Sequence, residues 1–341
     1  MASQLPMSQI SKNSDWSLWS GTDQQWNTAI NQFPLANIYQ SAQWAHYKSA
    51  AGWSNLRLVR LDSKQKLVAV AQCLVKKGPL NSAVLWIPGG PIGSVEFPAS
   101  SLLKSIKEEL KVSIMYVRAS FFNPTTNEDE LMLKNLGWTR CRTSLGAQKS
   151  MDYLLDQPEE IRRARCTTNW GRNLRRAEKN INHPYVWSNP NAFEIASAYR
   201  EMNQFKDVTN LNLSKSEADI SSIIDSFKEE LLIIRCDDDS GNIDSLRGVL
   251  RFSNRAWDFL ALTSPSGRKN YSSHAVFWHL TNVCQSLGVE SIDLSGIDPE
   301  NNKGVYDFKK GTGAQQIDYL GEWDVAQPRW MRPILSRIIA K

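Results

Sequence analysis

A basic run near the middle of the chain has residue types and a spacing that suit phosphate binding. Arg175, Arg176 and Lys179 follow Arg172 by three, four and seven residues, so in a helix the four side chains share one face. Such a face binds phosphate at a cleft or along RNA, or else it is a solvated helix surface. Asn169 comes at the start of this segment, where the free amides of a helix N-terminus also bind phosphate.

The sequence lacks the arrangements that build a nucleophilic or metal-dependent site. It contains no Gly-x-Ser-x-Gly elbow, no recognisable Cys–His pairing and no CxxC pair. Its five cysteines are far apart, and none of its four histidines stands at a metal-ligand spacing from another histidine and a carboxylate. We therefore expect no metal, no disulfide framework and no cofactor, with free and mostly buried thiols as in a cytoplasmic protein.

The bulk composition is that of a globular protein with anionic partners. A length of 341 residues suits two domains, and a formal net charge of +5 favours nucleic acid, nucleotide-linked substrates or lipid head groups. The sequence shows neither an apolar run long enough to span a membrane nor a signal peptide, so a cytoplasmic location is expected. Residues 1–14 are polar and irregular, which predicts disorder.

Hydrophobic periodicity predicts the same order of elements in both halves of the chain. Each half has helices, an antiparallel strand meander, a further helix and one more strand, which is an α/β layered pattern. The first half has strands at 56–61, 67–75, 84–87 and 112–119, with helices at 101–110 and 128–136. The second half has helices at 192–202, 215–227 and 272–287, with strands at 231–236, 246–252, 257–262 and 291–294.

Several stretches resemble the Fem family of aminoacyl-tRNA-dependent peptide aminoacyltransferases, which extend the peptide of peptidoglycan precursors. Residues 292–296, 302–311 and 319–324 follow the order D-x-x-G, spacer, G-V-x-x-F-K-x-G, and then Y-x-G-E. Residues 168–179 resemble the family's T-x-x-N-I-R-K-A-E-K helix, and residues 39–53 carry a Tyr-Gln, Trp, Lys and Gly-Trp pattern similar to its first lobe. The resemblance covers nearly the whole chain.

The resemblance implies an α/β (α+β) fold of two tandem GNAT-like lobes, that is, acyl-CoA N-acyltransferase-like lobes, facing one cleft. Lobe one is expected at residues 15–155 together with 316–341, and lobe two at residues 156–315. The C-terminal segment then returns to pack on lobe one.

The resemblance also implies an acyltransferase that moves an amino acid from aminoacyl-tRNA to an amine of a nucleotide- or lipid-linked peptidoglycan precursor. An ester donor is already activated, so catalysis needs positioning and stabilisation of an oxyanion. Lys309 matches the lysine of the F-K motif and is assigned to that charge, with Phe308 packing beside it. Ser120 stands where the family commonly has a carboxylate and is a candidate hydrogen-bond donor.

Lys48, Trp44 and Arg118 are further candidates for binding substrate or phosphate. Lys48 follows Trp44 by one helical turn and either contacts a diphosphate or extends along the surface. Arg118 ends a strand and either binds phosphate or forms a structural ion pair.

Two other features leave alternatives open. The stretch 330–341 has an apolar face and a basic rim, so it either docks on lobe one or contacts an anionic membrane at the inner face of the bilayer. The glycines at 311 and 313 are reminiscent of a coenzyme A loop, but the alternating residues 316–320 after them predict a strand rather than a helix. An acyl-CoA-dependent N-acyltransferase and a noncatalytic RNA- or nucleotide-binding module remain the rival functions.

Overall fold

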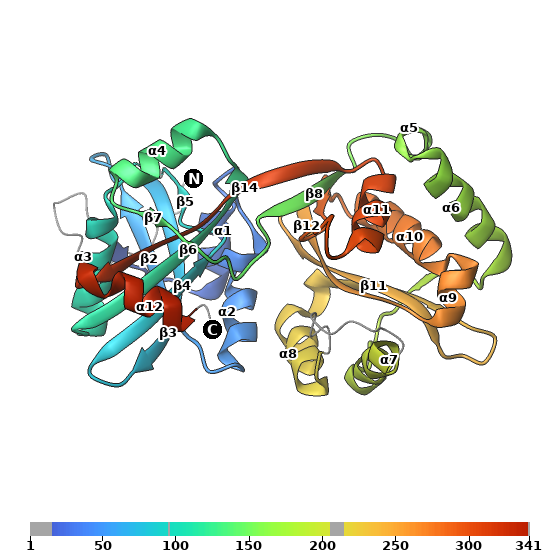
Figure 1. Ribbon diagram of the computed structural model, residues 1–341, viewed down its shortest axis with the longest axis horizontal. Helices are drawn as coiled ribbons and strands as arrows, with labels where there is room; N and C mark the ends of the chain where they lie inside the picture. Colours follow the sequence, from blue (N-terminus) through green and yellow to red (C-terminus); the bar gives the residue numbers. More distant parts are fainter. Residues whose placement is uncertain (1–15, 95, 205–214, 340–341) are drawn as a thin grey trace. The chain divides into compact units, whose positions relative to one another are not determined.

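The chain is divided into two compact units in the computed structural model, which describes residues 16–94, 96–204 and 215–339 (Figure 1). Unit 1 combines Met1–Gln148 with Asp318–Lys341. Unit 2 is Lys149–Ile317. Each unit has its own hydrophobic core.

The boundaries between the units differ by a few residues from those expected. Strand β8 (Lys149–Leu154), which we placed in lobe one, belongs to unit 2 because it pairs with β13 (Ser291–Asp293) of that unit. The later boundary follows Ile317 instead of residue 315. The disorder expected for residues 1–14 falls outside the described residues.

The sheet of unit 1 is a meander followed by one parallel crossover. Its main order is β1-β2-β3-β4-β6-β14, with β5 pairing with β3 and β7 with β14. Strands β4 and β6 are parallel, and the other pairs are antiparallel. The strands are β1 (Ser17–Leu18), β2 (Ser54–Leu61), β3 (Leu67–Gly78), β4 (Ser82–Pro88), β5 (Ile92–Gly93), β6 (Ile114–Pro124), β7 (Thr139–Arg140) and β14 (Gln315–Gln327).

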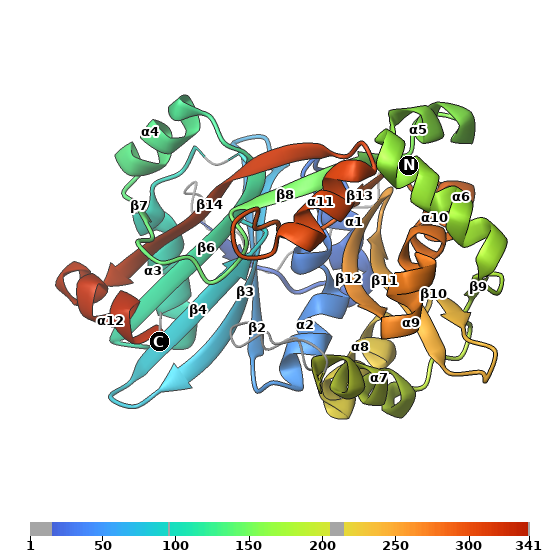
Figure 2. The same ribbon diagram turned by 45° about the vertical axis from the view of Figure 1, so that its right-hand side comes forward.

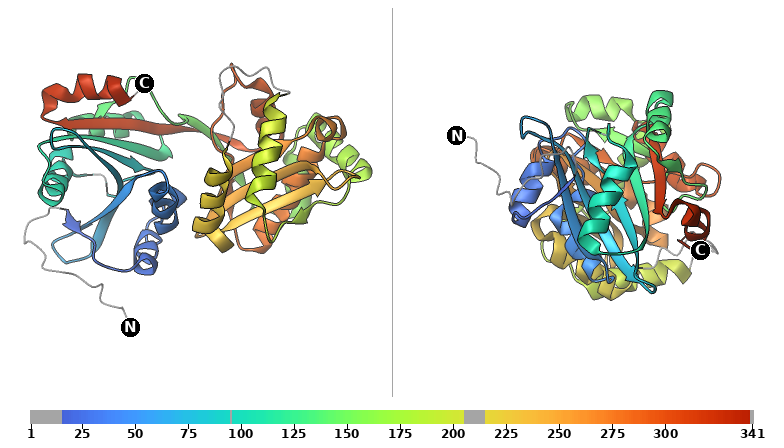
Figure 3. Two further views of the ribbon diagram at one scale, coloured as in Figure 1. Left: turned by 90° about the horizontal axis from the view of Figure 1, so that it is seen from below. Right: turned by 90° about the vertical axis from the view of Figure 1, so that its left-hand side faces the viewer.

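Helices cover both faces of this sheet, as the left view of Figure 3 shows for α3 on one side and α1–α2 on the other. The period of two along β3 explains this arrangement. Ala71 and Cys73 join the core under α3, while Gln72 faces η1 and α2, where its amide donates to the Ser41 carbonyl at 2.6 Å. The helices are α1 (Asp23–Ile30), η1 (Ile38–Gln40), α2 (Ala42–Ser49), α3 (Ala99–Leu110), α4 (Asn127–Asn135), η3 (Arg329–Met331) and α12 (Arg332–Ile339).

The sheet of unit 2 runs in the order β8-β13-β12-β11-β10-β9, and β12 and β13 are its parallel pair. Helices α6 and α10 lie on one side of it, and α7 and α8 on the other (Figure 1). The strands not yet given are β9 (Tyr185–Val186), β10 (Leu231–Asp237), β11 (Ile243–Phe252) and β12 (Arg255–Thr263). The helices are α5 (Glu159–Arg165), α6 (Thr168–Asn180), α7 (Ala192–Gln204), α8 (Glu217–Phe227), η2 (Lys228–Glu230), α9 (Pro265–Asn270), α10 (Ser272–Ser286) and α11 (Lys303–Gly311).

The two units repeat one architecture. In each, two helices precede an antiparallel meander, and a helix then leads to a parallel strand: α3 leads to β6 in unit 1, and α10 leads to β13 in unit 2. The expected α/β fold of tandem GNAT-like lobes is therefore confirmed. Across the part of the chain that the structure describes, no helix is both long and apolar enough to cross a bilayer.

Candidate functional site

Lys309 occupies the last turn of α11, and two consecutive backbone carbonyls hold its ammonium group. The Nζ atom donates to the Ser295 carbonyl at 3.2 Å and to the Gly296 carbonyl at 2.8 Å. Only 5% of Lys309 is exposed, whereas the neighbouring Lys310 is exposed to solvent. Lys309 is therefore a positioned, buried cation and not a solvated loop lysine.

The D-x-x-G motif supplies those two carbonyls. Ser295 has a left-handed backbone with φ of 63°, a conformation that is rare for a residue other than glycine. Its amide donates to Asp293 Oδ1 at 2.8 Å, and Asp293 also accepts from the Ser150 hydroxyl. Asp293 thus fixes the turn that presents the carbonyls to Lys309, through a local contact to Ser295 and a long-range contact from Ser150.

The surroundings of Lys309 are poorly solvated and charged. Burial lowers the pKa of Lys309 to about 8, against the opposing attraction of the Asp258 carboxylate. Asp258 is itself paired with the buried Arg247 guanidinium, whose Nε donates to Oδ1 at 3.0 Å. A lysine ammonium has three N–H donors. Two are used on carbonyls, and no acceptor among the described residues takes the third.

Phe308 packs into an aromatic cluster between α6 and α10. Its ring centroid lies 5.8 Å from that of Trp170 and 5.1 Å from that of His274. Burial lowers the pKa of His274 to about 4, so its imidazole is neutral at physiological pH. We did not single out His274 from the sequence, because a lone histidine on an apolar helix carries no spacing signal.

Helix α6 presents the expected basic residues to solvent. Its buried side consists of Trp170, Leu174 and Ala177, while Arg172, Arg175 and Arg176 are exposed together with Asn169. The Arg172 guanidinium donates to Asn169 Oδ1 at 2.6 Å. The Arg176 guanidinium donates to the Tyr271 hydroxyl at 3.4 Å.

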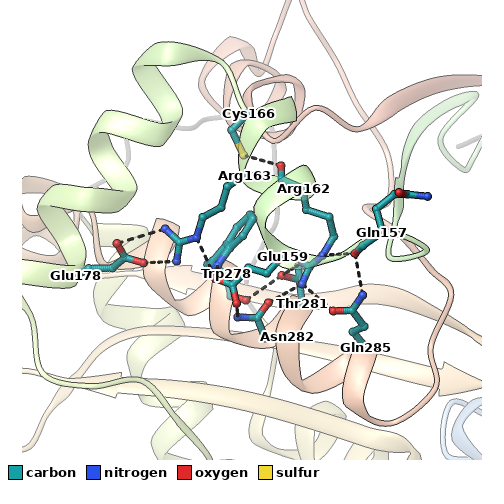
Figure 4. A network of polar contacts seen from close by, with 10 residues as sticks. All are labelled: Gln157, Glu159, Arg162, Arg163, Cys166, Glu178, Trp278, Thr281, Asn282 and Gln285. Atoms are coloured by element: carbon teal, nitrogen blue, oxygen red, sulfur yellow. Dashed lines mark hydrogen bonds and ion pairs between the residues drawn. The ribbon is translucent and has the colours of Figure 1, made fainter.

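Arg162 and Arg163, just before α6, are structural (Figure 4). Arg162 is fully buried and donates to side chains of α10, including Thr281 Oγ1 at 3.0 Å and Asn282 Oδ1 at 2.7 Å. Arg163 is paired with Glu159 at 2.9 Å and with Glu178 at 2.7 Å. Arg162 and Arg163 are therefore held by partners within unit 2, whereas Arg172, Arg175 and Arg176 of α6 are exposed.

In unit 1, Lys48 lies over a group of aromatic rings, of which Trp44 is buried and Tyr47 and Trp86 are half-buried. Its Nζ atom is 5.0 Å from the Trp44 ring centroid, 4.5 Å from that of Tyr47 and 5.9 Å from that of Trp86. Trp86 Nε1 donates to Ser120 Oγ at 3.2 Å, so the structure brings Trp44, Lys48 and Ser120 into one cluster. We did not single out Tyr47 and Trp86 from the sequence, because aromatic residues in a helix or an alternating strand are ordinarily predicted to lie in the hydrophobic core.

Arg118 does not serve as an open phosphate site. It is 3% exposed, and its Nε atom is 2.7 Å from Oε2 of Glu322, which is 4% exposed. Its guanidinium also donates to the Thr143 carbonyl. The alternative of a structural ion pair is what the structure shows, and Glu322 belongs to the Y-x-G-E motif.

Ionisable side chains elsewhere do not gather as metal ligands. The described residues contain no group of three or more His, Cys, Asp or Glu side chains able to hold a metal ion. All five cysteines are free.

Comparison with known proteins identifies relatives of this architecture. Residues 22–126 match the sequence model of the FemAB family. FemX is 16% identical, with 95% of this chain and 100% of that chain covered and a TM-score of 0.78. L-PGS from Bacillus licheniformis is 14% identical (94% and 98% covered, TM-score 0.52). A tandem GNAT protein from the clavulanic acid biosynthesis pathway is 9% identical (92% and 98% covered, TM-score 0.54).

No curated protein matched the chain. At such low identities the similarity to solved structures establishes the fold. The family match contains the 39–53 stretch, whereas the stretches 168–179 and 292–324 lie outside it. The resemblance to the Fem family is confirmed over residues 22–126, which match the FemAB family.

Proposed function

We propose that this protein transfers an amino acid from aminoacyl-tRNA to an amine of a peptidoglycan precursor, linked to either a nucleotide or a lipid. The family match over residues 22–126 supports a reaction of this class. The single observation that carries the proposal is the buried Lys309 ammonium, which two carbonyls orient. Such a fixed cation suits a reaction that develops negative charge on oxygen.

In the proposed reaction, the acceptor amine attacks the carbonyl carbon of the aminoacyl ester. A C–N bond forms, and the carbonyl oxygen becomes an oxyanion, which accepts a hydrogen bond from Lys309. The intermediate then collapses, the ester C–O bond breaks, and the tRNA ribose oxygen leaves. The proton lost by the amine is finally carried by that hydroxyl, so atoms and charge balance. No enzyme nucleophile is required.

The exposed α6 arginines and the Lys48 cluster are assigned to binding. The exposed arginines of α6 contact phosphates of the donor RNA, since a sequence-independent cationic face is the common way to bind a nucleic acid backbone. The Lys48 cluster of unit 1 contacts the acceptor, with aromatic faces for a sugar or base and an ammonium for a phosphate.

A donor comparison tests this proposal. The protein is incubated with a nucleotide-linked precursor and either charged bulk tRNA or acetyl-CoA, and the products are analysed by mass spectrometry. We expect an aminoacyl mass increment with charged tRNA alone. An acetyl increment would favour the acyl-CoA-dependent reaction, and RNA binding without any product would favour the noncatalytic module.

The pH dependence of turnover follows from the lowered pKa of Lys309. The Lys309 side chain is a cation only when it is protonated, so kcat should decline as pH rises through about 8. Well above that pH, the decline should be about tenfold per pH unit if this ionisation alone limits turnover. Rates are measured with freshly added donor and corrected for spontaneous ester hydrolysis. If kcat of the Lys309→Met variant declined with rising pH in the same way, the decline would belong to another ionisable group.

The α6 arginines are expected to make RNA binding depend on salt. Replacing Arg172, Arg175 and Arg176 together by alanine should flatten the slope of log affinity against log salt by about two to three units, because three fewer phosphate contacts release fewer counterions. Titrations of tRNA at several salt concentrations measure this slope. As a matched pair, Arg175→Ala is compared with Arg200→Ala on α7, which lies on the other side of the unit 2 sheet (Figure 1). An unchanged slope in the triple variant would leave α6 as a solvated surface.

A further inference from the structure

The C-terminal helix of unit 1 exposes an apolar stripe. Ile334 and Ile338 of α12 and Trp330 of the adjoining η3 are 49%, 62% and 71% exposed. The two isoleucines are four residues apart and lie on one side of α12, and Trp330 precedes Ile334 by the same spacing. The chain has thirteen tryptophans, all within the described residues, and Trp330 is the one with an exposed side chain.

The opposite side of this helix is fixed to unit 1, so the stripe is held in place. Arg332 Nε is paired with the fully buried Asp324, and its guanidinium donates to the Arg140 carbonyl at 3.2 Å. Met331 and Leu335 are half-buried. Figure 2 shows α12 at the margin of unit 1. Docking on unit 1 and contact with a membrane, the two alternatives expected for this segment, are therefore compatible, because one side of the helix docks while the other remains exposed.

A basic groove adjoins the start of the stripe. Arg329, next to Trp330 in the chain, lines a groove of about 840 Å³ between α3 and the end of β14. Lys104, Lys107 and Lys111 line the same groove at helical spacings of three and four residues. Four cations therefore face one carboxylate, that of Glu108. The lining residues are Ser100, Leu103, Lys104, Lys107, Glu108, Lys111, Ala326, Gln327, Pro328 and Arg329.

We propose that this face of unit 1 docks on the surface of an anionic phospholipid bilayer. The exposed tryptophan and isoleucines supply the apolar side of an interfacial helix, and tryptophan favours the head-group level of a bilayer. The groove supplies cations for lipid phosphates, with Arg337 of α12 adding a further exposed one. The proposal goes beyond the transfer reaction and does not depend on its donor.

The charge of the face decides between a membrane and a second copy of the chain. Two copies meeting through this face would bring two groups of four cations together, which is unfavourable. A negatively charged bilayer complements both the groove and the apolar stripe. We therefore take the bilayer as the occupant and self-association as an outcome of the test.

Vesicle co-sedimentation of the full-length protein tests the proposal. One set of vesicles is pure phosphatidylcholine, and the other contains equal parts of phosphatidylcholine and phosphatidylglycerol. Wild-type protein should bind the anionic vesicles and be released by salt. The variants Trp330→Ser with Ile338→Ser, and Lys104→Glu with Lys107→Glu, should each lower binding at least tenfold.

Matched controls lie elsewhere on unit 1. Leu80 is 84% exposed on the β3–β4 hairpin, so Leu80→Ser should bind as wild type. Lys64→Glu with Lys66→Glu removes two exposed cations from the β2–β3 turn and should cost much less than the groove variant. All variants should keep the wild-type unfolding temperature and turn over a water-soluble acceptor normally, which separates this proposal from the proposed reaction.

Three outcomes would overturn the proposal. These are no binding of wild type to phosphatidylglycerol vesicles, equal losses in the matched controls, and binding by both face variants at the wild-type level. A concentration-dependent dimer in analytical ultracentrifugation that the Trp330→Ser, Ile338→Ser variant abolishes, without any vesicle binding, would assign the face to a second copy.

Discussion

Replacing Lys309 by methionine is expected to lower kcat about a hundred- to a thousandfold while changing KM little, as loss of one preorganised oxyanion partner does. Methionine keeps nearly the length of the lysine stem and removes the charge. The lysine hydrogen bonds to Ser295 and Gly296 are lost, but no buried charge is left behind. Steady-state kinetics with the donor identified by the mass analysis measure the effect.

Lys310 provides the internal control for this experiment. It is the next residue of α11 and is exposed, with its Nζ atom 5.6 Å from the Tyr306 ring centroid, so Lys310→Met should be nearly neutral. If Lys309→Met raised only KM, Lys309 would bind a ground-state phosphate and the assigned oxyanion role would be wrong. Full turnover in both variants would make the F-K motif structural.

Glu322→Gln is expected to lower the free energy of unfolding by about 3–5 kcal/mol, because it leaves the buried Arg118 charge without its partner. The carboxylate also accepts hydrogen bonds from the amides of Leu145 at 3.0 Å and Gly146 at 2.8 Å. The NH2 group of a glutamine side chain would face one of these two backbone N–H groups, and two donors cannot form a hydrogen bond with each other. Urea unfolding followed by circular dichroism measures the change.

An exposed ion pair of the same unit is the matched control. Lys134, with a side chain 57% exposed, is 3.7 Å from Glu130, and Lys134→Ala should cost less than about 1 kcal/mol. Adding Arg118→Met to Glu322→Gln should recover part of the lost stability, since the unpaired charge is then removed. A Glu322→Gln protein as stable as wild type would contradict the structural role that we assign to the Y-x-G-E motif.

The sequence was sufficient to predict most elements and their repeated order. Hydrophobic period and turn residues are local, so the strands of both meanders and the helices α3, α8 and α10 were predicted within a few residues of their observed bounds. Strand β8 and helices α5 and α11 were not predicted. The three elements are short, and β8 pairs with a strand far along the chain, β13.

The candidate site was predicted only in part, because residue type does not reveal burial or pairing. The motif identified Lys309, but its two carbonyl partners are set by the packing of α11 against the turn after β13, which a local Asp293–Ser295 hydrogen bond holds.

Arg118 and Arg172 are the same residue type, and the sequence alone does not show that their environments differ. The first is buried against a glutamate 204 positions later, whereas the second is exposed on α6. Sequence alone determined which charges the chain carries, in what order and with what helical spacing. Tertiary structure decided which of them face solvent, because a charge enters the interior only where the fold supplies its partner.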